Sequence, residues 1–260
     1  MTDITSLDLL AAAGAGLAAG AINTIAGGGT LVSFPVLLAL GVPAVTANVT
    51  NTVALCPGYL GGAWAQRHHV QRQRASVFVL VPVCAAGGLL GGVVLLLTPE
   101  GAFRAVVPWL ILAACALLVV QEPLRRRLAR RRARTAASPG PGPGREAAAG
   151  AAVLPAAVYG GFFGAGLGVM LMAVLGIVLD DELPAVNAVK SILSLVINVV
   201  AALLFVLRAD VAWAYAAVLA PASLVGGHLA GHLVDRISAP VLRVVVIAFG
   251  VAVSVRMFTA

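Results

Sequence analysis

The feature that most constrains this chain of 260 residues is a series of long apolar runs, most of them without a charged side chain. A helix needs about 20 apolar residues to span the roughly 30 Å hydrocarbon core of a bilayer, and most of the runs are about that long. The runs cover residues 7–26, 30–41, 44–66, 75–97, 102–121, 148–168, 169–179, 184–207, 211–234 and 238–258. The chain is therefore predicted to be an all-α polytopic membrane protein with about 8–10 hydrophobic segments.

The composition supports this class. Hydrophobic residues make up 61% of the chain, charged residues 10%, and the mean hydropathy is +1.03, which exceeds the usual range of soluble domains. Several long uncharged runs exclude a protein that only lies on the membrane surface. The first run is not expected to be a secretory signal, because it lacks a basic segment and begins near Asp3 and Asp8.

The segment from Gly20 to Asn51 recurs in altered form 141 residues later. Identical pairs at this offset include Gly20/Gly161, Gly27/Gly168, Pro43/Pro184, Ala44/Ala185, Val45/Val186, Ala47/Ala188, Arg67/Arg208 and Val70/Val211. Two copies of an apolar unit are typical of transporters whose halves enclose a site near the bilayer midplane. We therefore expect a first transmembrane repeat at 1–121, a linker at 122–147 and a second transmembrane repeat at 148–260.

The net charge of +7 is concentrated in loops, and 16 of the 17 lysines and arginines are arginines. Arg67, Arg72 and Arg74 lie in one short loop with His68 and His69. The linker contains Arg125, Arg126, Arg127, Arg130, Arg131, Arg132, Arg134 and Arg145. Basic residues gathered in loops follow the positive-inside rule of membrane proteins. The expected partner of these charges is the lipid bilayer, and no nucleic acid is expected.

The arginines also predict a topology. Loop 67–74 and linker 122–147 should be cytoplasmic, and the turn near Pro99 should face outward. No Lys or Arg precedes Arg67, which indicates an external N-terminus. The first half then crosses the membrane an odd number of times, so the second half is inverted and the C-terminus is external. The Pro/Gly-rich tract at 135–146 is expected to be a flexible cytoplasmic tether.

Two short apolar runs, 30–41 and 169–179, each follow a glycine-rich break. A broken helix exposes backbone groups, which a membrane tolerates only inside protein or beside a water-filled cavity. A helix that restarts after the break would direct N–H groups and partial positive charge toward an anion. The substrate-binding candidates at these breaks are Gly27, Gly28, Gly29 and Thr30 in the first half and Gly166 and Gly168 in the second. Close packing of helices at the glycines is the alternative.

Polar residues interrupt two of the apolar runs at matching places. The candidates in the first half are Asn48, Thr50 and Asn51, and those in the second are Asn187, Lys190, Ser191, Ser194 and Asn198. The second set recurs every three or four residues, so it forms one stripe on a helix. A polar stripe in lipid is costly, so it should face the other repeat or a cavity. It would either bind an anionic substrate or form hydrogen bonds between helices.

Lys190 is the only lysine of the chain, and it lies inside an apolar run. An ionisable group within the membrane indicates function. Its ammonium would neutralise an anionic substrate, and an amine held away from water could also carry a coupled proton. The alternative is a lysine near a helix end whose side chain reaches the lipid headgroups.

The glycine breaks and the polar runs together resemble a known family. The sequences GGGTLVSFPVL (27–37) and LGVPAVTANVTN (40–51), with GGFFGAGLG (160–168) and LPAVNAVKS (183–191), resemble the sulfite exporter TauE/SafE family of membrane transporters. The resemblance implies movement of small sulfur-containing anions such as sulfite, sulfoacetate or other sulfonates across the bacterial inner membrane. The chain departs from the family's pattern in its second copy, with GAGLG for a fuller glycine triplet and AVKS where ATS is common.

Other residues carry weaker signals. His228, His232 and Asp235 lie on one helical face, which would suit a metal or a proton relay, but a helix end close to packed glycines is the preferred interpretation. Three isolated cysteines are expected to be core residues, and no metal or cofactor is expected. Motifs of ATPases, serine hydrolases, zinc proteases and redox enzymes do not occur, so an enzyme is not expected.

These observations predict a secondary transporter for small sulfur-containing or organic anions, coupled to the proton gradient. An uncoupled anion channel and a membrane-embedded scaffold or enzyme subunit are the alternatives. The substrate, the direction of transport and the oligomeric state, including a homodimer, are left open by the sequence.

Overall fold

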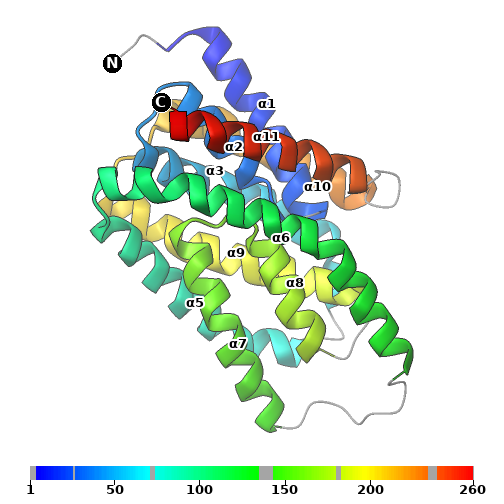
Figure 1. Ribbon diagram of the computed structural model, residues 1–260. Helices are drawn as coiled ribbons and strands as arrows, with labels where there is room; N and C mark the ends of the chain where they lie inside the picture. Colours follow the sequence, from blue (N-terminus) through cyan, green and yellow to red (C-terminus); the bar gives the residue numbers. More distant parts are fainter. Residues whose placement is uncertain are drawn as a thin grey trace.

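The computed structural model describes residues 4–25, 27–70, 74–134, 143–179, 183–233 and 239–259. Throughout these residues the regular structure is helical, as predicted. The helices are α1 (Ser6–Ile25), α2 (Thr30–Ala39), α3 (Ala44–Ala65), α4 (Arg67–Val70), α5 (Arg74–Leu97), α6 (Glu100–Arg134), α7 (Pro143–Phe162), α8 (Leu167–Val178), α9 (Leu183–Arg208), α10 (Trp213–Leu233) and α11 (Ala239–Thr259) (Figure 1).

Five of the described helices are long and apolar enough to cross a membrane. They include residues Ser6–Ile25, Ser76–Leu97, Glu100–Gln121, Pro184–Arg208 and Trp213–Ala230. Large apolar side chains on their outer faces remain exposed, among them Leu97 at 78% and Phe78 at 77%. An apolar exterior of this extent suits lipid rather than water. The prediction of an all-α polytopic membrane protein is confirmed.

Both predicted helix breaks are present. The first separates α1 from α2, and Gly27 has a φ of +81° there. The second separates α7 from α8, where Gly164 and Gly166 have φ values of +78° and +77°. Side chains disfavour this left-handed conformation, so glycine permits each helix to end and restart. The run expected to continue to residue 168 therefore ends as a helix at Phe162.

The helices that follow the breaks are short. Helix α2 has 10 residues and α8 has 12. At about 1.5 Å per residue, each extends roughly 15 to 18 Å, about half the hydrocarbon thickness.

Helices α3 and α9, which the 141-residue offset relates, run antiparallel. Gln66, directly after α3, accepts a hydrogen bond from Asn187 near the start of α9, with 2.6 Å between Nδ2 and Oε1. At the other end of the pair, Ala212 follows α9 and donates its N–H to Thr50 Oγ1 over 2.9 Å. An inverted repeat requires this antiparallel arrangement. The repeat itself stays a prediction from the sequence.

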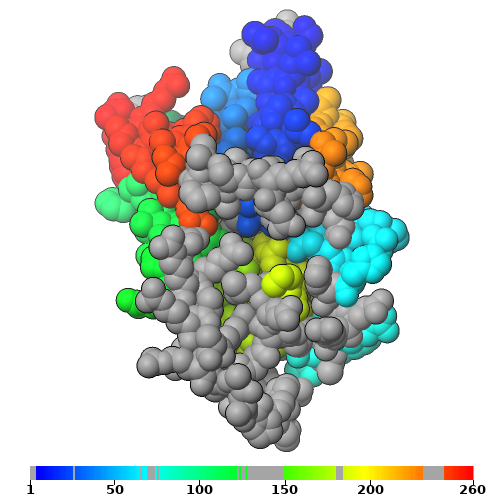
Figure 2. Space-filling model, turned by 90° about the vertical axis from the view of Figure 1, so that its right-hand side faces the viewer, coloured from blue at the N-terminus to red at the C-terminus, as the bar shows by residue number. Residues whose placement is uncertain are grey.

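The packing pairs helices from opposite halves of the chain. Helix α1 packs against α10, and α7 packs correspondingly against α5. Helices α6 and α11 contact each other, as do α3 and α9. Figure 2 shows α1 at the top of one face, with α10 beside it at the right and α11 at the left. The two halves therefore interleave.

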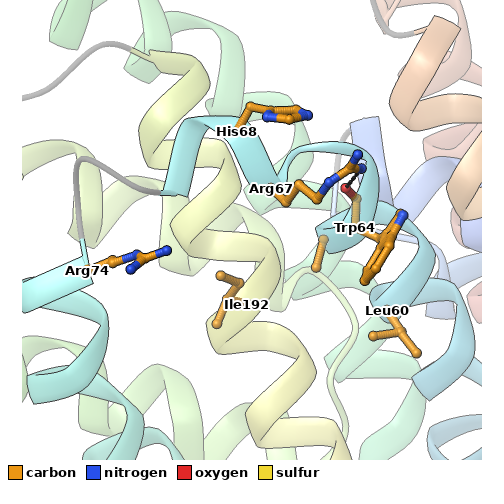
Figure 3. Close-up of a pocket in the computed structure, with 7 residues that line it drawn as sticks. Leu60, Trp64, Arg67, His68, Arg74 and Ile192 are labelled. Atoms are coloured by element: carbon orange, nitrogen blue, oxygen red, sulfur yellow. Dashed lines mark hydrogen bonds between the residues drawn. The ribbon is translucent and has the colours of Figure 1, made fainter.

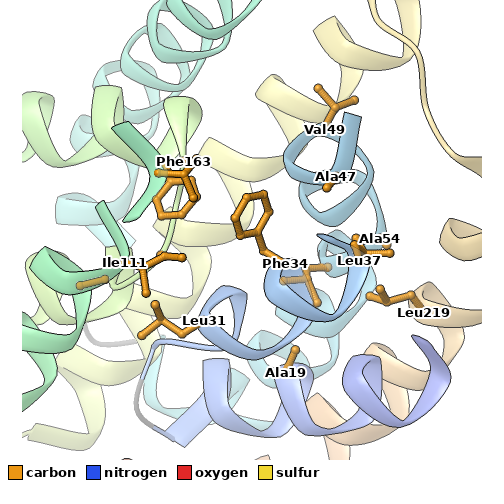
Figure 4. Close-up of a cluster of buried hydrophobic side chains, with 14 of the residues drawn as sticks. Ala19, Leu31, Phe34, Leu37, Ala47, Val49, Ala54, Ile111, Phe163 and Leu219 are labelled. Carbon is orange, nitrogen blue, oxygen red and sulfur yellow. The ribbon is translucent and has the colours of Figure 1, made fainter. Parts of the chain in front are cut away.

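The core lies around the first break and the facing end of the second. Phe34 of α2 and Phe163, directly after α7, make an edge-to-face contact with ring centroids 5.3 Å apart (Figure 4). Both rings are buried, and Leu31 and Leu37 of α2 are buried with them. Helix α2 is thus enclosed by protein, which is the condition for a broken helix at membrane depth.

The predicted linker is partly helical. Helix α6 continues through its arginine-rich end to Arg134, and α7 begins at Pro143. The predicted tether at 135–146 is therefore helical from residue 143, and its part at 135–142 lies outside the described residues. In Figure 1 the N- and C-terminal ends lie together, and the end of α6 and the start of α7 lie at the opposite end.

Candidate substrate-binding site

A cluster of buried polar side chains surrounds the first helix break. It consists of Asn23 of α1, Thr30 and Ser33 of α2, Asn51 of α3 and Lys190 of α9, and none of them is more than 4% exposed. We call these five residues the polar cluster. Buried polar groups in an apolar protein are costly unless they are hydrogen-bonded, so the contacts within the cluster indicate which groups remain available.

Asn23 stabilises the restart of the helix. Its Oδ1 accepts the N–H of Gly29 over 2.7 Å, which satisfies a backbone group at the start of α2. Gly29 lies so close to α1 that an added Cβ would be 2.1 Å from the carbonyl oxygen of Ala19. The amide nitrogen of Asn23 is buried and has no hydrogen-bond partner within the described part of the chain. The break therefore presents an unused donor inside the protein.

Asn51 connects α3 to α2. Its Nδ2 donates to Thr30 Oγ1 over 3.3 Å, and Ser33 Oγ donates to Asn51 Oδ1. Ser33 also lies 3.3 Å from the carbonyl oxygen of Gly29. The predicted candidates Thr30 and Asn51 are thus brought together directly at the break.

Lys190 lies beside this network as a buried cation. Its Nζ is 3.4 Å from the main-chain carbonyl oxygen of Asn23, and only 3% of the residue is exposed. Among the described side chains no carboxylate forms an ion pair with it. The side chain does not extend to the protein surface, as a snorkelling lysine would. Leaving a buried charge unpaired costs several kcal/mol, so an anion at this position would be strongly favoured.

The other members of the α9 stripe also face protein. Ser191, Ser194 and Asn198 are buried, as the helical spacing predicted. Asn198 Nδ2 donates to the carbonyl oxygen of Ser194 over 2.8 Å, and the hydroxyl of Ser194 is buried without a partner among the described residues. These three side chains therefore extend the buried polar face of α9 on which Lys190 lies.

The second break has its own hydrogen bonds. Asn48 Nδ2 donates to the carbonyl oxygen of Phe162, the last residue of α7, over 2.9 Å. The Tyr159 hydroxyl donates to the carbonyl oxygen of Ala165 over 2.7 Å. Gly166 forms the start of α8 in a left-handed conformation. Asn48 thus satisfies a backbone group that the break exposes.

The two breaks touch each other at Gly27 and Gly168, which the 141-residue offset relates. A Cβ added to Gly27 would be 2.6 Å from the Cα of Gly168, and the reverse distance is the same. Side chains at either position would force the two breaks apart. The structure therefore brings one glycine candidate of each half, Gly27 and Gly168, into contact.

Three predicted candidates lie elsewhere. Thr50 binds the N–H of Ala212, and Asn187 binds Gln66 near the predicted cytoplasmic end of α3. Gly28 faces the side chain of Leu118, where an added Cβ would be 3.2 Å from Cδ1. Ser191, which follows Lys190 in the chain, has its hydroxyl 3.5 Å from Gln66 Nε2.

Sequence reasoning missed Asn23, Ser33 and Gln66. Asn23 precedes the triple glycine inside an apolar run, and Ser33 follows Thr30 by one helical turn. Both residues could have been identified from the sequence as polar neighbours of a helix break. Gln66 has no such signal, since it follows the last apolar residue of its run.

The histidine hypothesis receives little from the structure. His228 is exposed on α10, while the His232 side chain and Asp235 lie outside the described residues. No group of three or more His, Cys, Asp or Glu residues able to hold a metal is present in the described residues. Cys84 and Cys115 are buried and Cys56 is half-buried, all as free thiols.

Long apolar helices around two touching breaks, with a buried cation beside them, define a polytopic membrane transporter by architecture. The model of the family described as Sulfite exporter TauE/SafE matches residues 12–257. The chain belongs to the TauE/SafE family of multi-pass membrane transporters.

Similar proteins carry the same general description. A "Probable membrane transporter protein" of Haemophilus influenzae is 25% identical over 247 residues, which cover 93% of this chain and 91% of that protein. The "Probable membrane transporter protein YfcA" of Escherichia coli K12 is 23% identical, over 92% of this chain and 85% of that protein. The "Probable membrane transporter protein ORF9" of a Sinorhizobium species is 30% identical over 98 residues, 36% of each chain.

Proposed function

We propose that this protein is a secondary transporter that moves small sulfur-containing or organic anions across the bacterial inner membrane, coupled to the proton gradient. Sulfite, sulfoacetate and related sulfonates are the substrate class. The observation that carries the proposal is the buried ammonium of Lys190, which has no carboxylate partner among the described side chains. The family description, which names a sulfite exporter, supports the same class of substrate.

The polar cluster supplies the chemistry that an oxyanion needs. Lys190 provides the opposite charge, and Asn23, whose main-chain carbonyl oxygen Lys190 contacts, provides a neutral donor with its free amide nitrogen. Neutral donors bind an anion without adding charge, which keeps binding weak enough for release. The start of α2 adds its partial positive charge close to the same place.

Release of the anion requires the site to open alternately to the two sides. Gly27 and Gly168 are the contact between the two breaks, so relative movement of the halves would separate or slide them. Lys190 would carry the coupled proton, because an amine can release a proton whereas a guanidinium keeps its own.

Transport by three purified proteins in proteoliposomes tests the proposal. Sulfite flux is measured for the wild type, Lys190→Arg and Lys190→Met, each with and without a pH gradient. Lys190→Met should lose most of the flux, because no charge remains to bind the anion. Lys190→Arg should keep some flux but lose its dependence on the pH gradient, because a guanidinium keeps its proton.

The exposed Arg208 at the end of α9 provides the matched control, and Arg208→Met should leave the flux unchanged. Wild-type flux and pH dependence in Lys190→Met would overturn the role of the lysine. Flux that needs Lys190 but ignores the pH gradient in the wild type would indicate an uncoupled anion facilitator.

A further inference from the structure

A pocket of about 390 Å³ opens at the end of α3. It is outside the polar cluster and lies between α3, the short helix α4, the start of α5 and α9. Its walls are of two kinds. Leu60, Ala63, Trp64 and Ile192 form an apolar part, and Arg67, His68 and Arg74 form a basic rim.

The basic rim is held in place by the helix ends. Arg67 Nη1 donates to the carbonyl oxygen of Trp64 over 3.0 Å, and its guanidinium carbon is 5.1 Å from the centroid of the Trp64 ring. In Figure 3 the Arg74 side chain extends from the start of α5 toward α9, where Ile192 lies. Among the described side chains no carboxylate neutralises Arg67 or Arg74. The described part of the chain thus supplies no negative group to the rim, which leaves the rim able to bind a negatively charged ligand.

The apolar part of the pocket continues onto the outer surface of the bundle. Trp64 is 61% exposed and Leu60 is 51% exposed, in a protein whose outer apolar side chains face lipid. An exposed tryptophan at the end of a membrane helix is typical of the interface between headgroups and acyl chains. The pocket therefore combines a basic rim that can bind a negatively charged group with an apolar wall that can contact acyl chains.

We propose that this pocket binds an anionic phospholipid, with the phosphate of its headgroup between Arg67 and Arg74 and its acyl chains along Leu60 and Trp64. Basic pockets between membrane helices on the cytoplasmic side suit anionic headgroups. Arginine forms paired hydrogen bonds with phosphate oxygens, so two arginines would fix the headgroup. The lipid would hold the loop after α3 against α9, near the hydrogen bond between Gln66 and Asn187.

A phospholipid fits better than a free small anion because of the apolar wall. Sulfite or phosphate would gain nothing from Leu60 and Trp64, whereas acyl chains bury that surface. This proposal stands apart from the transported anion and would hold for any substrate of the protein.

Lipid binding to the full-length protein in neutral detergent tests the proposal. The probes are dioctanoyl phosphatidylglycerol, dioctanoyl phosphatidylcholine, glycerol 3-phosphate and inorganic phosphate, each measured by native mass spectrometry and by thermal stability. Phosphatidylglycerol should bind and stabilise the wild type, whereas the other three probes should not. The double variant Arg67→Gln/Arg74→Gln should bind phosphatidylglycerol about tenfold to hundredfold more weakly, the loss expected for removing charged hydrogen bonds to phosphate.

The matched control is Arg104→Gln/Arg256→Gln, which removes two exposed arginines outside the pocket and should leave binding unchanged. Equal binding of phosphatidylglycerol by both double variants would overturn the proposal. So would equal binding of phosphatidylcholine by the wild type, a result that needs no variant to fold. Binding of inorganic phosphate alone, or displacement of the lipid by sulfite, would show instead a free-anion site that leads toward Lys190.

Discussion

Lys190 and Asn23 meet across the two halves of the chain, and the contact is between a cation and a neutral carbonyl oxygen. The 3.4 Å distance from Nζ to that oxygen makes it a weak partner for an ammonium. A carboxylate within ion-pair distance of Nζ would neutralise the lysine permanently. The absence of such a partner among the described side chains leaves the charge free to respond to a ligand.

Supplying that missing carboxylate gives a sharp prediction at the residue scale. Asn23→Asp keeps a side-chain oxygen that can accept the Gly29 N–H and puts a negative charge on the residue whose main-chain carbonyl oxygen Lys190 contacts. We expect the variant to be at least as stable as the wild type and to transport at least about tenfold more slowly, a loss of roughly 1.4 kcal/mol in anion affinity. Thermal unfolding and sulfite flux in proteoliposomes measure the two effects.

Asn23→Ala separates the charge from the lost hydrogen bond. It leaves the Gly29 N–H without its acceptor and should lower stability by about 1–3 kcal/mol. Transport by Asn23→Asp at the wild-type rate would contradict the proposal, because it would show that transport does not depend on an unpaired Lys190 ammonium.

The polar stripe on α9 was predictable because helical spacing alone places Lys190, Ser194 and Asn198 on one face. Its partners were not, since nothing in a single run indicates which helix will lie opposite. Asn23 shows the limit clearly. A single polar residue in an apolar run shows no helical periodicity. Its role depends on the chain placing the Gly29 N–H beside it after the break.

At the scale of helices, the first break depends on how closely α2 approaches α1. A Cβ on Gly29 would lie 2.1 Å from a backbone oxygen of α1, which cannot move away as a side chain would. We expect Gly29→Ala to lower stability by several kcal/mol, beyond the usual cost of a point mutation. Thermal unfolding in detergent is the measurement.

Gly14 of α1 is the control, because an added Cβ there meets no atom within 4 Å. Alanine should be tolerated or should stabilise the helix by about 0.5–1 kcal/mol. Equal effects of the two substitutions would contradict the close approach of α1 and α2.

The start of α3 depends on a residue from another helix. Glu100, at the start of α6, accepts the N–H groups of Ala44 at 2.5 Å and Val45 at 3.0 Å. A carboxylate at a helix N-terminus satisfies free donors and complements the helix dipole. We predict that Glu100→Gln lowers stability by about 0.5–2 kcal/mol, measured by thermal unfolding. Asp210→Asn, at an exposed acid without such a contact, should change nothing, and an equal loss there would refute the specific role of Glu100.

The helices were largely predictable because apolar runs of membrane length have few alternative structures. Their ends were less so. The run through residue 168 reads as continuous by hydropathy, but two left-handed glycines end the helix at Phe162. The Glu100 contact was also out of reach, since it joins positions 56 residues apart.

For the whole molecule, the positive-inside rule predicts the orientation of the bundle. Cysteines introduced singly at Asp210 and Ser138 should differ in intact cells: an impermeant thiol reagent should label position 210 and leave position 138 unlabelled until the cells are permeabilised. The native cysteines are buried or half-buried, so the unsubstituted protein is the background control. Labelling of position 138 from outside would reverse the topology.

The interleaving of the halves also has a consequence for biosynthesis. Helix α1 must wait for α10, its main packing partner, which begins about 200 residues later. At roughly 5–20 residues per second, the wait is on the order of 10 to 40 s. During that time the face of α1 that packs on α10 has lipid or the insertion machinery as its neighbour in place of α10. A ribosome that stalls after the linker would therefore leave an unfinished protein, and membrane proteases would have ample time to recognise it.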